Sequence, residues 1–300
     1  MKVLVTGSTG FVGSALVRGL AARGHAVTRL VRSSSPPGAE GVRWDPKSGA
    51  VEPHGLEGMT AVVHLAGENI AGGRWTRERK ERIRESRVAG TRLLVDSLLR
   101  LDRPPAALLC ASAVGYYGDR GDEVLREDSP PGRGFLAEVC RDWEAAAEPA
   151  AGRGIRVVRL RIGMVLGPGG GALAAMLPAF RAGAGGRIGG GRQYVSWIAL
   201  SDLVGVVEHV LETPSLKGAV NAVSPRPVTN REFAGTLGRV LGRPTVLFLP
   251  ASLARLLLGE MADELLLSGQ RVEPAKLLDS EYRYLHPELE GALRSILGKE

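Results

Sequence analysis

The sequence predicts an α/β protein built on a doubly wound parallel sheet, and three observations lead to that prediction. Short, almost entirely apolar runs recur along the first half of the chain, which is typical of strands buried on both faces of a parallel sheet. Segments with helical periodicity separate these runs. A glycine-rich turn follows the first run and opens the first helix. Such alternation implies right-handed crossovers that place helices on both faces of the sheet.

The predicted elements follow one another in order along residues 1–168. MKVLVTG is a β-branched run that ends in glycine, and a helical stripe from Val12 to Leu20 follows it until Gly24 ends the helix. HAVTRLVR, AVVHLAG, AALLCAS and IRVVRLRIG repeat the strand pattern, and helical segments near 77–100 and 134–150 separate the later runs. We expect this part of the chain to form one sheet domain.

Residues 169–300 have a different texture and predict a smaller C-terminal domain on the substrate side. A glycine-rich stretch follows Pro168, and we expect the chain to return to the sheet near 195–225. Thr229 and Glu232 form a capping box ahead of one helix, and HPELEGALRSIL supplies a last amphipathic helix. We expect this domain to close a small-molecule cleft.

Composition limits the class of protein. The 300 residues are 44% hydrophobic, which suits a globular core. No apolar run approaches the roughly 20 residues of a membrane helix, and the chain enters a strand at once, so we expect a cytoplasmic protein without membrane contact. Cys110 and Cys140 fit neither a disulfide framework nor a metal site. We expect two reduced, buried thiols and no metal.

The net charge of +7 raises the question of a nucleic-acid partner. The densest basic stretch, residues 73–87, alternates its arginines with Glu78, Glu81 and Glu85 at helical spacings. Ion pairs on a solvated helix face explain this stretch better than a track for phosphates. We expect no nucleic-acid partner, and the excess charge instead favours attraction of an anionic cofactor or substrate.

Gly7, Gly10 and Gly13 follow the first strand and open the first helix, which is the context of a dinucleotide-binding loop. The backbone turns tightly at the first glycine, approaches a pyrophosphate at the second, and lets the helix pack on the strand at the third. Free N–H groups at the start of the helix then face the phosphates. The alternative is a purely structural strand-to-helix turn.

The end of the second strand predicts which nicotinamide cofactor this loop holds. Proteins specific for NAD place an acid there to bind the adenosine ribose. Val31 fills that position, and Arg32, Ser33 and Ser34 follow it. A guanidinium and two hydroxyls suit the 2′-phosphate of NADP. We therefore predict NADP(H) rather than NAD; the alternative is that Arg32 is a solvent-facing loop arginine.

Several motifs resemble the extended branch of the short-chain dehydrogenase/reductase superfamily, namely TGSTGFVGS, AVVHLAG, ASAVGYYG and LRIGMVLGP. GENIAGGRWT, SRVAGTRLL, WEAAA, the glycine-rich stretch through QYVSWI, VTNREFA and the C-terminal helix are similar to the atypical "epimerase family" proteins, which carry a C-terminal domain of unknown function. The resemblance covers nearly the whole chain. It implies a Rossmann-type fold with a nicotinamide cofactor.

The resemblance also implies where the cofactor binds. The residues that would cradle the pyrophosphate are Thr6, Gly7, Thr9, Gly10, Phe11, Val12 and Gly13. Val31 and Arg32 would meet the adenosine side, and Leu65, Ala66 and Gly67 would line the adenosine and ribose. Arg87 stands where extended members usually have an asparagine, so it would reach cofactor or substrate oxygens. A structural salt bridge inside the helix layer is the alternative for Arg87.

The tyrosine and lysine that the superfamily uses for catalysis are absent. They normally lie four residues apart on the helix after the fifth strand, where the lysine lowers the tyrosine pKa. With Glu144 aligned to the family's usual glutamate, Leu136 takes the tyrosine position and Cys140 the lysine position. None of the five tyrosines has a lysine four residues on. This departure matches the atypical group, and substitutes must be sought in the pocket.

Polar residues near the strand ends are the candidate substitutes. Ser112 would polarise a substrate oxygen, and Tyr116 or Tyr117 would donate a proton if a nearby cation lowered the phenol pKa. Both tyrosines are otherwise packing residues. The candidate substrate-binding residues are Glu68, Asn69, Gln193 and Tyr194. For the first two, a solvated carboxylate and a loop-capping amide are the alternatives.

The sequence thus predicts an NADP(H)-dependent oxidoreductase or epimerase-like enzyme that acts on a small molecule. The rival hypothesis is an NADP(H)-binding sensor or scaffold that has lost the chemistry and binds a protein partner according to nucleotide state. The missing tyrosine and lysine favour the sensor, whereas the glycine-rich loops and second domain favour the enzyme. A polar, open cavity beside the nicotinamide would support the enzyme. The substrate's identity and association into a homo-oligomer are left open.

Overall fold

The computed structural model describes residues 1–32, 41–46, 48–51 and 55–299. Its central sheet has eight strands in the order β13-β8-β6-β5-β1-β2-β3-β4, and every neighbouring pair is parallel except β3 and β4. The strands are β1 (Lys2–Thr6), β2 (Ala26–Arg32), β3 (Val42–Asp45), β4 (Ala50–Val51), β5 (Ala61–His64), β6 (Ala107–Ala113), β8 (Arg156–Ile162) and β13 (Gly218–Ala222). The predicted doubly wound parallel sheet is confirmed.

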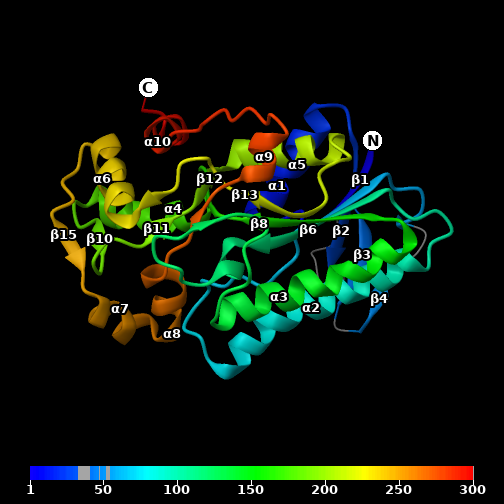
Figure 1. Cartoon of the computed structure of the whole chain (residues 1–300), viewed down its shortest axis with the longest axis horizontal. Coiled ribbons are helices and arrows are strands. Elements are labelled where there is room, and N and C mark those ends of the chain that lie inside the picture. Colours follow the sequence, from blue (N-terminus) through cyan, green and yellow to red (C-terminus); the bar gives the residue numbers. More distant parts are fainter. Residues whose placement is uncertain (33–40, 47, 52–54, 300) are drawn as a thin grey trace.

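Helices cover both faces of this sheet (Figure 1). On one face α1 (Phe11–Ala22) packs beside α5 (Leu200–Glu212), and on the other α2 (Arg77–Leu99) packs beside α3 (Phe135–Ala147). Val3 and Val5 of β1 point into the first core, whereas Leu4 points into the second. Because the interior strands are buried on both faces, most of their residues are apolar, which explains why nearly continuous apolar runs marked them in the sequence.

A smaller C-terminal lobe lies at one end of the sheet (Figure 1), around a core that includes the fully buried Trp197. The predicted capping box of Thr229 and Glu232 is present. The chain returns from β12 to the sheet through α5 and β13. The lobe comprises β9 (Met164–Leu166), α4 (Gly171–Arg181), β10 (Gly186–Ile188), β11 (Tyr194–Val195), β12 (Trp197–Ala199), β14 (Val228–Thr229), α6 (Asn230–Leu241), β15 (Leu247–Leu249), α7 (Ala251–Leu258), α8 (Glu260–Ala262), the π-helical turn η4 (Asp263–Leu267) and α10 (Leu289–Leu297).

Several short elements complete the chain. The 3-10 turn η2 (Val114–Tyr117) follows β6, and the 3-10 turn η3 (Glu148–Arg153) joins α3 to β8. The paired strands β7 (Val124–Leu125) and β16 (Arg271–Val272) and the helix α9 (Ala275–Asp279) link the C-terminal part of the chain to the sheet domain. In the described ranges no helix is both long and apolar enough to cross a bilayer. Cys110 and Cys140 are free and buried, as expected, and burial raises the pKa of their thiols to about 12 and about 11. Both are therefore protonated thiols at neutral pH.

A chain of buried hydrogen bonds joins the glycine turn to α2 through His64. Thr6 Oγ1 accepts the N–H groups of Leu65 and Ala66 at 3.1 Å each, so its own proton goes to Nδ1 of His64 at 2.7 Å. Nε2 of His64 then donates to Oγ1 of Thr91 on α2 at 3.0 Å. The neutral imidazole satisfies both neighbours, and it fixes the segment after β5 against the end of β1.

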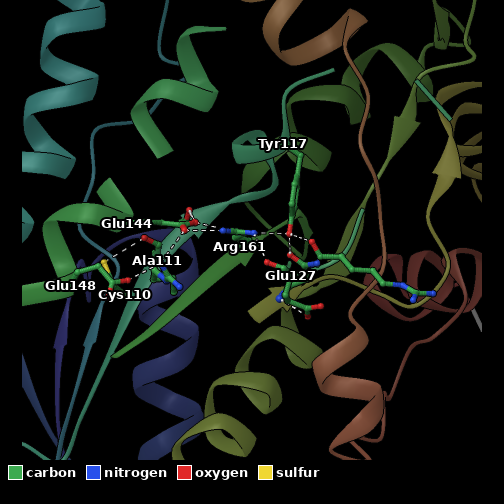
Figure 2. A network of polar contacts seen from close by, with 11 residues as sticks. Cys110, Ala111, Tyr117, Glu127, Glu144, Glu148 and Arg161 are labelled. Atoms are coloured by element: carbon green, nitrogen blue, oxygen red, sulfur yellow. Dashed lines mark hydrogen bonds and ion pairs between the residues drawn. The ribbon is translucent and has the colours of Figure 1, made fainter. Parts of the chain in front are cut away.

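A buried ion pair ties the second half of the sheet to α3 (Figure 2). Arg161 on β8 donates from Nε and Nη2 to the two carboxylate oxygens of Glu144 at 2.8 and 3.0 Å, and Ser112 on β6 donates to the same carboxylate at 2.8 Å. Nη1 of Arg161 donates to the hydroxyl oxygen of Tyr117 at 2.9 Å. The same hydroxyl donates to Oδ1 of Asn221 on β13 at 2.7 Å. Burial opposes the charge on Arg161, but bonding to Glu144 more than offsets it and raises the pKa.

Removing either charge of this pair is expected to lower the free energy of unfolding strongly. Glu144→Met or Arg161→Met leaves the other ion, only 4% exposed, without compensation, at a cost of about 3–5 kcal/mol. The double variant is expected to lose much less than the sum, because no isolated charge remains. Urea denaturation of the four proteins measures the coupling. The exposed pair Arg226–Glu288 is the matched control and should show almost no coupling; strictly additive losses at 144 and 161 would contradict this account.

The buried imidazole predicts a pH dependence of stability. Burial lowers the pKa of His64 from 6.5 to about 4 in the fold. The unfolded chain therefore takes up a proton that the fold excludes as the pH falls from 6.5 toward 4, and folding loses about 3 kcal/mol over this window. Above pH 6.5 the imidazole is neutral in both states and its contribution is constant. Unfolding free energies of wild type and His64→Gln at about pH 7.5 and about pH 4.5 should show a smaller pH dependence in the variant; equal dependences would refute the assignment.

Candidate functional site

Two of the three glycines in the turn, Gly7 and Gly13, have no room for a side chain. Gly7 has φ +65°, and a Cβ there would lie 2.8 Å from the carbonyl carbon of Leu65. A Cβ on Gly13 would lie 2.1 Å from the carbonyl oxygen of Gly7, which also accepts the N–H of Gly10 at 3.0 Å. The turn therefore needs glycine at its first and third positions, and it presents bare backbone at the start of α1.

The start of α1 fits an anionic pyrophosphate. Its N-cap is Gly10, which has no side chain to occupy the helix N–H groups, and Phe11, Val12 and Gly13 bring no acid into the first turn. The hydroxyl of Ser8 is buried and, within the described part of the chain, has no hydrogen-bond partner. An orphaned buried hydroxyl costs free energy until a ligand oxygen satisfies it. The glycine turn thus provides both the partial positive charge of a helix start and a hydroxyl donor without a partner.

The residues predicted to meet the adenosine lie at the ends of neighbouring strands. Val31 is buried and Arg32 is exposed at the carboxyl end of β2. Leu65, Ala66 and Gly67 follow β5 beside the glycine turn, because Thr6 holds the first two by their N–H groups. Thr9 is exposed. Ser33 and Ser34 lie outside the described residues. The strand order β5-β1-β2 thus gathers these segments along one edge.

Arg87 on α2 lies beneath the segment after β5. Its guanidinium donates to the carbonyl oxygens of Ile83 and Glu68 at 3.1 and 3.0 Å, and it lies 5.1 Å from the ring centroid of Trp143. A Cβ on Gly67 would come within 3.2 Å of the guanidinium carbon. Among the described residues its hydrogen bonds go to main-chain carbonyls, so the alternative of a structural salt bridge is not what the structure shows. Arg87 is a half-buried cation directly under the cofactor-side loop.

Glu68 and Asn69 are held by Arg79 near the start of α2. Arg79 Nη1 lies 3.4 Å from the Glu68 carboxylate, and its Nη2 donates to the carbonyl oxygen of Asn69. The Asn69 side chain accepts the N–H of Ala71 at 2.9 Å. The loop-capping alternative describes Asn69, and Glu68 is tied to the helix rather than freely solvated.

Ser112, Tyr116 and Tyr117 contact the pair of Glu144 and Arg161. Figure 2 shows this pair with Tyr117 beside it. Ser112 is 3% exposed and donates its hydroxyl proton to Glu144. Tyr117 is fully buried, and burial raises its pKa to about 12. The ring centroid of Tyr116 lies 3.5 Å from the guanidinium carbon of Arg161. Their catalytic role stays a prediction, and their contacts are those of residues that hold the η2 turn in place.

A cavity of about 300 Å³ opens between η2, the start of α3 and the C-terminal lobe. Leu136, in the family's tyrosine position, lines it, whereas Cys140 one turn further along α3 is buried. The other walls are partly polar. They include Gly115, Asp119, Arg133, Glu264 and Ser268. The cleft is therefore open and polar where the superfamily places its catalytic tyrosine.

Glu264 is a site residue that sequence reasoning missed. From η4 its two carboxylate oxygens accept the N–H groups of Phe135 and Leu136 at 3.0 and 3.2 Å, so it caps α3 across the cavity. A Cβ on Gly134, the N-cap with φ +107°, would lie 2.5 Å from that carboxylate. The only hint in the local sequence is that α3 begins at Gly134 and not at a capping serine, threonine or aspartate, so its first N–H groups need a partner from elsewhere in the chain.

Gln193 and Tyr194 support the cavity wall from behind. Gln193 Nε2 donates to the carbonyl oxygens of Ile188 and Leu266 at 3.1 and 2.8 Å, which ties η4 to β10. A Cβ on Gly269 would come within 2.4 Å of the Tyr194 backbone nitrogen. In the described structure both residues therefore hold the loop that bears the wall.

Two family models match the chain. The NAD dependent epimerase/dehydratase family covers residues 3–223, and a domain of unknown function, DUF1731, covers 249–296. An epimerase family protein of Mycobacterium bovis is 45% identical over 291 residues, 97% of this chain and 96% of that protein. The human epimerase family protein SDR39U1 is 40% identical over 300 residues, 99% of this chain and 100% of that protein.

Solved structures agree with these relatives. A crystal structure of human SDR39U1 with NADPH superposes with a TM-score of 0.92 at 39% identity, covering 100% of both chains. A nucleoside-diphosphate sugar epimerase from Corynebacterium glutamicum gives 0.81 at 37% identity, covering 100% of this chain and 59% of that one. The chain therefore belongs to the NAD dependent epimerase/dehydratase family, as an epimerase family protein of the extended short-chain dehydrogenase/reductase branch.

Proposed function

We propose that the chain is an NADP(H)-dependent oxidoreductase or epimerase-like enzyme whose small-molecule substrate binds in the cavity beside Leu136. The observation that carries the proposal is the pairing of a phosphate-ready glycine turn, with its orphaned Ser8 hydroxyl, and an open polar cavity at the start of α3. A chain that bound nucleotide only as a signal would not need such a cavity.

The described residues fit a phosphorylated dinucleotide. The glycine turn and the first turn of α1 would hold the pyrophosphate, and Arg32 would pair with the 2′-phosphate. Val31 is buried and apolar, so in the described part of β2 no acid at the carboxyl end of the strand repels that phosphate. The human relative, crystallised with NADPH, supports the same choice.

Arg87 supplies a cation where the superfamily uses its lysine. The Arg87 guanidinium and the Cys140 thiol are close enough to influence each other's pKa, and Cys140 occupies the family's lysine position. When bound, NADPH would supply a hydride to a substrate carbon, and NADP+ would accept one in the reverse direction. In the proposed enzyme Arg87 orients cofactor or substrate oxygens from α2 in place of an ammonium on α3.

The proton that accompanies reduction must pass through a group at the cavity. Ser112 and Tyr117 act in this proposal as positioning residues, because their hydroxyls are committed to Glu144 and Asn221. Asp119 lines the cavity, is exposed, and accepts the N–H groups of Gly121 and Gly269 on Oδ1 at 3.3–3.4 Å. No other described residue hydrogen-bonds its carboxylate, so in this proposal Oδ2 faces the cavity and relays a proton between solvent and substrate.

A sensor or scaffold that binds NADP(H) without turnover remains the second candidate. Leu136 and Cys140 in place of the catalytic pair favour it. NADPH oxidation in the presence of carbonyl compounds separates the two, since only the enzyme consumes cofactor. Binding without consumption across a broad panel of aldehydes, ketones and sugar nucleotides would favour the sensor.

Titration of the nucleotide-free protein with NADPH and NADH, followed by cofactor fluorescence, tests the cofactor half. We expect NADPH to bind more tightly, and Arg32→Glu to weaken NADPH about 10- to 100-fold through loss of a charge-assisted contact, with little effect on NADH. Arg29→Glu, an equally exposed arginine on the same strand, is the control and should leave the preference intact. If the protein bound neither NADPH nor NADH, the proposal would be overturned. If Arg32→Glu kept the preference for NADPH, Arg32 would have no part in binding the 2′-phosphate.

The role of Arg87 has its own test. Arg87→Met is expected to weaken NADPH binding about tenfold, the effect of losing one charged hydrogen bond, and Arg87→Lys to restore part of it. Arg84→Met is the control, because Arg84 lies on the same helix but pairs with Asp142 and Glu138. Thermal unfolding is measured alongside. A lower melting temperature with unchanged NADPH affinity would show that Arg87 only holds the loop at Glu68.

A further inference from the structure

One end of the C-terminal lobe exposes an unusual amount of apolar surface. Six of the ten large apolar side chains that are exposed in the described ranges fall within residues 246–257, with exposed fractions of 41–83%. They are Val246, Leu247, Phe248, Leu253, Leu256 and Leu257, and we call them the β15–α7 patch. Figure 1 shows β15 and α7 together at the end of the molecule opposite β1–β4. None of the six carries a charge.

The strand in this patch has one open edge. β15 pairs in parallel with β10 alone, in the register Arg187 opposite Phe248. The Leu249 carbonyl accepts the N–H of Gly189 at 2.8 Å, so Leu247 and Leu249 turn their peptide groups toward β10. Phe248 consequently directs its N–H and C=O to the other edge, where no described residue hydrogen-bonds them. An uncovered strand edge is a template for another strand.

The helix in this patch exposes leucines on its outer side. Ala254 faces the lobe and is fully buried, whereas Leu253, Leu256 and Leu257 face away from it and are exposed. The exposed Arg255 of the same helix is paired with Asp263 at 2.9 Å. A surface helix ordinarily turns its apolar side to the core and its polar side to solvent. The outer face of α7 therefore has the character of an interface rather than of a solvated surface.

The size of the patch indicates what covers it. Six side chains so exposed present on the order of 600 Å² of apolar surface, the upper end of the largest patch on an ordinary monomer. This is most of the roughly 800 Å² that each partner contributes to a stable interface. The exposed face of α2 is instead charged and internally paired, for example Arg77 with Glu81, and offers no comparable surface.

We propose that a second copy of this chain covers the β15–α7 patch across a two-fold axis. Strands related by a two-fold axis run antiparallel, and a single outward-facing residue at the axis exchanges both N–H···O bonds with its own copy. Phe248 meets that requirement. Pro244 and Pro250 bracket the strand and confine the pairing to this short segment, so the contact closes as a dimer instead of growing. The two α7 helices then bury their leucines against each other.

Sedimentation equilibrium of the full chain tests the dimer. We expect wild type to be dimeric at micromolar concentration, and Leu256→Glu/Leu257→Glu to raise the dimer dissociation constant at least about tenfold. Leu285→Glu is the matched control, since Leu285 is 70% exposed but lies outside the patch. A wild type that stays monomeric at about 100 µM, or a double variant as dimeric as wild type, overturns the proposal.

Two further readouts identify the contact itself. In the wild-type dimer the Phe248 amide is expected to exchange with deuterium at least about tenfold more slowly than in the Leu256→Glu/Leu257→Glu monomer; equal rates overturn the strand pairing. Vesicles of phosphatidylcholine with phosphatidylglycerol are the probe for a membrane. A monomeric wild type that co-sediments with them overturns the dimer in favour of a lipid surface. Both readouts are independent of NADPH binding, so their failure leaves the proposed function untouched.

Discussion

The buried pair of Glu144 and Arg161 is the constraint on which the substrate half of the molecule depends. Neither ion is tolerable alone in a closed core, so the side chains must meet with every donor and acceptor satisfied. The hydrogen bonds that satisfy the two ions hold α3 against β8 and engage Ser112 of β6. They also orient Tyr117 toward β13, because Arg161 donates to its hydroxyl. Through Asn221, which also donates to the carbonyl of Glu273, the same network reaches the segment that leads from the lobe. The position of the η2 turn follows from this electrostatic requirement.

The two halves of the site are built by different means. The cofactor side rests on one rigid edge, where the β1 turn and the segment after β5 are joined by Thr6 and His64. The cavity instead lies between parts of the chain far apart in sequence, and Glu264 links them by capping α3. The position of the start of α3 therefore depends on the C-terminal lobe. Phe11 at the start of α1 also lies against the lobe, since a Cβ on Gly170 would come within 2.3 Å of its ring.

The cofactor side could be predicted from the sequence because its signals are local. A strand, three spaced glycines and a helix stripe occupy two dozen consecutive residues, and the end of β2 is marked by Val31 and Arg32. The cavity could not be predicted in this way, since Glu264 lies 129 residues from Phe135 and no motif joins them. The family resemblance implied a catalytic role for Ser112, and Tyr116 and Tyr117 were candidates because they lie on the same loop. The resemblance could not show that a glutamate and an arginine from other elements occupy the hydroxyls of Ser112 and Tyr117.

The absence of the catalytic lysine at position 140 and the presence of a cation at Arg87 are linked by electrostatics. Cys140, in the lysine position, is buried, and its thiol and the Arg87 guanidinium lie close enough to shift each other's pKa. A lysine at position 140 would bring a second cation near the Arg87 guanidinium, and like charges disfavour each other's charged form. Leu136 also stands in the tyrosine position, so a single substitution at position 140 could not restore the usual pair. The role proposed for Arg87 rests on this arrangement.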